Sequence, residues 1–134
     1  MIQTIEAQQR RGIEMLNVSP EQMQRYIATA RARQQRRLAE LEQRRLHGFE
    51  IAKTAAQILK TEFSASRVVL FGSLSGPHFH ETSDLDLSIW DLPEKTYFKA
   101  VARLLSLSDF DIDLVEVQYA SPEMLAAIAQ GIEL

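Results

Sequence analysis

The chain has 134 residues, of which 46% are hydrophobic, and this composition suits one globular domain with a hydrophobic core and a helical extension. It has no cysteine, which excludes disulfides, thiolate catalysis and cysteine-based zinc sites, and no apolar run approaches the roughly 18 residues of a membrane span. We therefore expect a cytoplasmic protein. The net charge of −3 is unevenly distributed, because residues 1–50 carry +3 and residues 51–134 carry −6.

The N-terminal part of the chain is expected to be helical. Residues 2–16 have apolar side chains at helical spacing, which predicts a short amphipathic helix. Ser19 and Gln22 then flank Pro20 in the pattern of a capping box, so a long helix should begin there. The arginines within residues 31–37 are spread around this helix, which favours a solvated surface over the alternatives of a partner-docking helix or, more weakly, an RNA-contacting one.

Further along, the helix acquires an apolar face. Hydrophobic residues at positions 38, 41, 49, 52, 56, 59 and 63 follow a spacing of three or four residues that only Arg45 interrupts. Gly48 lies inside this pattern and predicts a bend or a boundary. We therefore expect an N-terminal helical arm, residues 1–48, and a second domain, residues 49–134, that opens with a core helix of roughly residues 49–62.

The periodicity then changes to that of β-strands. Residues 67–71 form a short apolar run that ends at Gly72 and Ser73, as expected of a buried strand followed by a tight turn. Residues 84–90 alternate strictly between apolar and other side chains, which predicts a second strand with aspartates on one face and leucines on the other.

The remaining segments complete an alternating pattern of helices and strands. A helix is predicted for residues 93–105, started by Pro93, and a third strand for residues 110–117. Ser121 is then expected to cap a last helix that stops near Gly131.

Two aspartates in the second predicted strand suggest a metal site. Asp84 and Asp86 lie two residues apart, so their carboxylates point to the same side about 7 Å apart at the backbone. Aspartate is unfavourable in strands, and an oxygen-only ligand set favours Mg²⁺ or Mn²⁺ over zinc. Because protein-bound Mg²⁺ usually completes its shell with water and phosphates, this pair points to a nucleotide.

The turn before these aspartates supplies a second part of the pattern. Gly72 allows close approach of the backbone, and the amides together with the Ser73 hydroxyl are suited to a phosphate. The complete pattern, G-S-x10-D-x-D, closely resembles the signature of the DNA polymerase β-like nucleotidyltransferases, in particular the minimal nucleotidyltransferases. The resemblance covers residues 49–134 and includes the segment "DIDLVEV", which is similar to the third strand of that family.

The resemblance implies an α/β (α+β) fold with a small mixed β-sheet flanked by helices. It also implies that Gly72 and Ser73 hold the triphosphate of ATP, that Asp84 and Asp86 bind two Mg²⁺ ions, and that Asp113 is the third catalytic and metal-binding carboxylate. Asp111 shares the face of Asp113 and stays an alternative for the third carboxylate. The proton of an attacking hydroxyl would pass to this third carboxylate.

Minimal nucleotidyltransferases often act as antitoxins, and the resemblance therefore implies a HEPN-domain ribonuclease toxin as the partner. The expected reaction transfers AMP from ATP to a tyrosine of that toxin. Two alternatives stay open: a catalytically weak module that neutralises a partner by docking through its N-terminal helix, and nucleotidyl transfer to a small hydroxyl compound. The same helix is also a candidate for homo-oligomer formation, whereas neither a membrane nor a nucleic-acid partner is expected.

One feature departs from the family pattern. Many minimal nucleotidyltransferases have an arginine shortly after the Gly-Ser pair, but no basic residue lies between Ser73 and Asp84. The triphosphate charge should then be met by the metal ions, by backbone amides and by Lys95 or Lys99. Slower activity, or a site completed by a partner, is the expected consequence.

Overall fold

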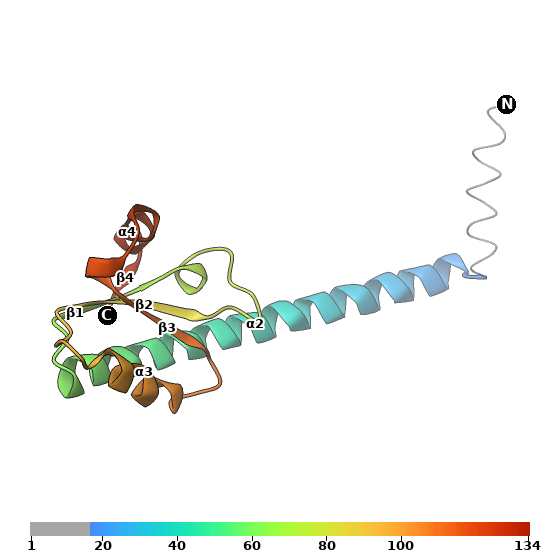
Figure 1. Ribbon diagram of the computed structural model, residues 1–134. Helices are drawn as coiled ribbons and strands as arrows, with labels where there is room; N and C mark the ends of the chain where they lie inside the picture. The colour runs from blue at the N-terminus through green and yellow to red at the C-terminus, as the bar shows by residue number, and fades with distance from the viewer. Residues whose placement is uncertain (1–16) are drawn as a thin grey trace. The chain divides into compact units, whose positions relative to one another are not determined.

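The computed structural model describes residues 17–134, and the helix expected for residues 2–16 lies outside this range. The elements are α2 (Pro20–Glu62), β1 (Arg67–Phe71), the 3-10 turn η1 (Ser73–Ser75), β2 (Leu85–Trp90), α3 (Tyr97–Leu105), β3 (Ile112–Glu116), the 3-10 turn η2 (Val117–Tyr119), α4 (Pro122–Ala129) and β4 (Ile132–Glu133) (Figure 1). The chain divides into two compact units, Met1–Glu40 and Leu41–Leu134. Within residues 17–134, no helix combines the length and the apolar character needed to cross a membrane.

Helix α2 begins as the capping pattern predicts. The Ser19 N–H donates to Gln22 Oε1 over 2.8 Å, and the Gln22 N–H donates to Ser19 Oγ over 3.1 Å. These reciprocal bonds satisfy amides that have no partner inside the helix. From Pro20 to Glu40 every side chain is exposed, so this part of α2 contributes nothing to the hydrophobic core.

The bend predicted at Gly48 is wrong, because α2 continues through this position without a break. Gly48 is buried, and a Cβ atom there would lie 3.1 Å from Leu74 Cδ1 of η1. The glycine therefore serves close packing. Core contacts begin at Leu41, whereas Leu38, which was expected on the apolar face, is 59% exposed.

The four strands form one mixed sheet in the order β3-β2-β1-β4. β1 is antiparallel to both β2 and β4, and β2 is parallel to β3, which confirms the mixed sheet expected from the sequence. Strand β4 was not predicted, because two residues carry no readable periodicity. Gly131 lets it reach β1, since a Cβ atom there would lie 2.5 Å from the Leu70 carbonyl oxygen.

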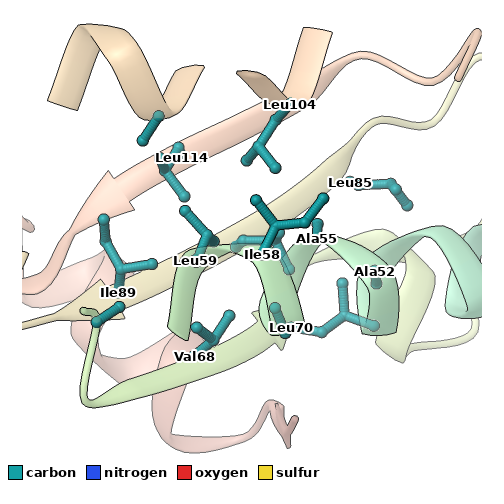
Figure 2. Packing of buried hydrophobic residues seen from close by; sticks show 14 of the residues in the cluster. Ala52, Ala55, Ile58, Leu59, Val68, Leu70, Leu85, Ile89, Leu104 and Leu114 are labelled. Atoms are coloured by element: carbon teal, nitrogen blue, oxygen red, sulfur yellow. The ribbon is translucent and has the colours of Figure 1, made fainter. Parts of the chain in front are cut away.

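The two faces of the sheet are covered by different helices. On one face, the part of α2 that follows Leu41 packs with α3 against the inward residues of β1, β2 and β3, and Figure 2 shows this core around Leu59 and Leu70. On the opposite face, Ile128 of α4 packs against Val69 and Phe71 of β1. Figure 1 shows α4 on the side of the sheet opposite α3. The aspartates of β2 and β3 lie on this second face, where α4 is the covering helix.

Several boundaries differ from the expectations, and one helix cap agrees with them. Helix α3 begins at Tyr97 and not at Pro93, because the Thr96 N–H donates to the Pro93 carbonyl in a turn that precedes the helix. Strand β3 ends at Glu116, one residue before the predicted end. The cap of α4 is confirmed, since the Met124 N–H donates to Ser121 Oγ over 3.2 Å.

Candidate active site

The pairing of β2 with β3 brings two carboxylates together. In the parallel register Asp86 lies opposite Asp113, so both side chains leave the same face of the sheet on neighbouring strands. They come from segments that are far apart in the sequence. β3 is the edge strand, so Asp113 stands at the border of the sheet while Asp86 stands inside it.

The environment of Asp86 disfavours its ionised form. Burial, followed by repulsion from Asp113 and Asp84 and by a hydrogen bond with Asp113, raises the pKa of Asp86 from 3.8 to about 6. Among residues 17–134, no cationic side chain is one of the groups that shift the pKa of Asp86. Perturbed groups of this kind are concentrated at functional sites.

Gly72 lies directly beside Asp86. Its backbone has φ 79° and ψ −153°, a conformation essentially restricted to glycine, and a Cβ atom would collide with Asp86 Oδ2. Ser73 then opens η1, and the Gly76 N–H closes this turn on the Ser73 carbonyl over 3.2 Å. Among residues 17–134 no hydrogen bond engages the Ser73 hydroxyl, which leaves it available to a ligand.

Asp84 and Asp111 differ in their relation to Asp86. Asp84 precedes β2 and is one of the charges that raise the pKa of Asp86. The Asp111 carbonyl accepts the Leu85 N–H over 2.9 Å and continues the ladder. Asp111 and Asp113 are both exposed, but only Asp113 is among the groups that raise the pKa of Asp86. Asp84, Asp86 and Asp113 are therefore close enough for their charges to interact, because Asp84 and Asp113 both raise the pKa of Asp86.

The donor chemistry of this cluster fits a hard divalent cation. Carboxylate oxygens are the ligands that Mg²⁺ prefers, and a cation would relieve the repulsion that raises the pKa of Asp86. In the part of the chain that the structure describes, no three histidine or acidic side chains form a ready-made metal site. Since Mg²⁺ commonly takes one or two carboxylates plus phosphates and water, Asp86 and Asp113 could supply the protein ligands of a Mg²⁺ site.

A pocket of about 480 Å³ opens at the carboxylate pair. Its lining combines Asp86, Asp113 and Tyr97 with a mostly apolar wall: Phe71, Val101, Ile112, Leu114, Val115 and Met124. The Tyr97 hydroxyl donates to the Leu114 carbonyl over 2.7 Å, and burial, with the negative charges of Glu116 and Asp113, raises the pKa of Tyr97. The sequence placed Tyr97 only in a core-packing helix, because its spacing carries no sign of a pocket.

Comparison with known families identifies the fold and the class of chemistry. The family model described as Polymerase beta, Nucleotidyltransferase matches residues 53–134, which is more than half of the chain, so the chain belongs to this nucleotidyltransferase family. This confirms the resemblance found in the sequence. A search of curated proteins finds no significant match.

Two solved structures of toxin–antitoxin complexes are similar to this chain. A mutant of the MntA–HpeT toxin–antitoxin pair is 23% identical with a TM-score of 0.52, and the match covers 61% of this chain and 70% of that chain. A tri-AMPylated HEPN toxin of Shewanella oneidensis in complex with its MNT antitoxin matches at 22% identity and a TM-score of 0.49, over 64% of this chain and 70% of that chain. The first of these likenesses shows a common fold.

Proposed function

We propose that this protein is a Mg²⁺-dependent nucleotidyltransferase that transfers AMP from ATP to a hydroxyl, most simply a tyrosine, of a HEPN-domain toxin and so acts as its antitoxin. The observation that carries the proposal is the pair of Asp86 and Asp113, which lie opposite each other on neighbouring strands, with Gly72 directly beside Asp86. Family membership supplies the class of reaction. The choice of acceptor rests on the resemblance to minimal nucleotidyltransferases.

Each residue of the site has a separate role in the proposed reaction. The turn at Gly72 and Ser73 binds phosphate oxygens through its amides and hydroxyl. Asp86, Asp113 and Asp84 would hold Mg²⁺, and the bound cation would neutralise phosphate charge and stabilise the attacking and leaving oxygens. Asp113 accepts the proton of the attacking hydroxyl. A bond forms from the hydroxyl oxygen to the α-phosphorus, the bond from that phosphorus to the bridging oxygen breaks, and pyrophosphate leaves.

The domain division is part of the proposal. Residues 49–134 form the nucleotidyltransferase domain, and the arm, residues 1–48, serves association with a partner or with a second copy. Support comes from the part of the arm that the structure describes, where the side chains of residues 20–40 are exposed and arginine-rich. An exposed helix gains stability when its apolar side chains pack on another surface.

The proposal is tested by following the transfer of labelled AMP from ATP to protein. We expect the purified protein, incubated with α-labelled ATP, Mg²⁺ and lysate of the source organism, to label one protein band. The variant Asp84→Asn/Asp86→Asn should give no band, because it removes ligands for Mg²⁺. Glu81→Gln/Glu94→Gln, which removes two exposed charges outside the site, is the matched control and should label normally. Normal labelling by the double Asn variant would refute the proposed site.

A further inference from the structure

The pocket at the carboxylate pair contains no cationic side chain. Its described lining includes two aspartates and neither lysine nor arginine. ATP brings a triphosphate of high negative charge to this acidic site, and enzymes that transfer nucleotides or phosphoryl groups commonly place arginine or lysine on those oxygens. A bound divalent cation would offset part of the charge. The remaining charge calls for a basic group from elsewhere.

The basic residues of the unit Leu41–Leu134 are mostly engaged with their own acids. Among the described residues, five of them form ion pairs: Arg44 with Asp109, Arg45 with Glu42, Lys53 with Glu50, Arg67 with Glu133 and Arg103 with Glu62. Lys60 donates to the Leu134 carbonyl. Lys95 and Lys99 are exposed and do not line the pocket.

The opposite situation holds in the unit Met1–Glu40. Five arginines of α2, at positions 25, 31, 33, 36 and 37, are exposed, and none forms an ion pair within residues 17–134. We call these five residues the arm arginines. The same stretch exposes the apolar side chains of Met23, Tyr26, Ile27 and Leu38. It therefore offers apolar surface for association together with uncompensated positive charge.

We propose that the arm arginines of one copy of this chain complete the nucleotide site of a second copy. The inference rests on the proposed function, because it assigns a phosphate-binding role at that same site. Charge complementarity favours a second copy of this chain as the binding partner of the arm, since residues 1–50 carry +3 and residues 51–134 carry −6. In an isologous dimer each arm serves the site of the other copy, so both sites are completed by one contact type.

Arginine suits this role for a chemical reason. Its planar guanidinium binds phosphate oxygens through two parallel hydrogen bonds and keeps its charge at every relevant pH. Several arginines distributed around a helix also attract the nucleotide before it is seated. ATP affinity should then depend on the arm arginines even though none of them belongs to the unit Leu41–Leu134.

The first measurement is the affinity of the full-length protein for Mg²⁺-ATP by calorimetry, with the mass of the particle determined by sedimentation. We expect a dimer, and we expect replacement of the five arm arginines by glutamine to weaken ATP binding about tenfold or more while circular dichroism stays unchanged. Lys53→Gln/Arg103→Gln, which removes two exposed positive charges outside the pocket, is the matched control and should bind ATP normally. A monomeric wild type, or an arm variant with unchanged affinity, would overturn the inference.

The second measurement tests whether the arm acts on another copy. The arm variant and Asp86→Asn/Asp113→Asn are each expected to bind Mg²⁺-ATP poorly, but a heterodimer of the two has one site with intact carboxylates beside an intact arm. After mixing and exchange, roughly a quarter of the sites should recover tight binding. No recovery in a verified heterodimer would show that the arm does not complete the site of a second copy.

The two proposals fail in different ways. If ATP binding depends on the arm and recovers on mixing, but no protein is labelled by α-labelled ATP, the proposed transfer is wrong and the composite nucleotide site stands. If labelling requires Asp84 and Asp86 but ATP binding is indifferent to the arm arginines, the transfer stands and the composite site is wrong.

Discussion

Replacing Asp86 by asparagine should stabilise the ligand-free protein at neutral pH. The pKa of this group is about 6 in the folded state against 3.8 as its ordinary value, because burial and the neighbouring aspartates oppose ionisation. The folded state therefore binds the proton more tightly than the unfolded state does. The contribution of this group to the free energy of unfolding is fully present below pH 4 and is lost as the pH rises to about 6. Above that pH the destabilisation caused by the ionised carboxylate no longer changes.

The size of the effect follows from the pKa difference. A difference of about two pH units corresponds to roughly 3 kcal/mol at 1.36 kcal/mol per unit. Asp86 is only half-buried, so solvent screening reduces this to about 1–2 kcal/mol. Asparagine keeps the shape of the side chain and removes the charge, so Asp86→Asn should raise the free energy of unfolding by that amount at pH 8 and by little at pH 4.5.

The assay is urea unfolding without divalent cations at about pH 4.5, 6 and 8, followed by circular dichroism. Glu81→Gln, which removes one exposed loop charge, is the control for net charge. Added Mg²⁺ should stabilise the wild type more than Asp86→Asn at pH 8, because only the wild type offers both carboxylates. An equal gain at all three pH values, or the same gain in the control, would show that carboxylate crowding is not the cause.

Three further variants test other contacts of the site. Gly72→Ala should lose nucleotidyl transfer and about 1–3 kcal/mol of stability, because the added Cβ would collide with a carboxylate oxygen at a positive φ. Gly76→Ala is the control, since a Cβ atom there would meet nothing closer than 3.9 Å. This control should behave like the wild type in both assays. Asp113→Asn should reduce the transfer rate about a hundredfold or more while Asp111→Asn keeps it, and the reverse order in a labelled-ATP assay would reassign the third carboxylate. Tyr97→Phe should cost about 1 kcal/mol in urea unfolding through the lost hydrogen bond to a β3 carbonyl, and an unchanged midpoint would contradict this role.

Much of the local structure could be predicted from the sequence, because it depends on neighbouring residues. The alternation around Asp84 and Asp86 predicts the strand, and the pattern at Ser19 and Gln22 predicts the helix start that the structure confirms. The spacing of Gly72 and Ser73 from these aspartates also indicates the nucleotidyltransferase family, to which the chain belongs.

Other features depend on which segments meet in space, and only the tertiary structure decides these. The parallel register of β2 and β3 sets Asp86 opposite Asp113, a juxtaposition that no local periodicity encodes. Gly48 looked like a helix boundary because glycine weakens helices, yet packing against Leu74 keeps the helix intact there. Asp86 shows the division most clearly: the sequence determines that a carboxylate stands in a strand, and the assembled sheet determines that burial and a second carboxylate raise its pKa.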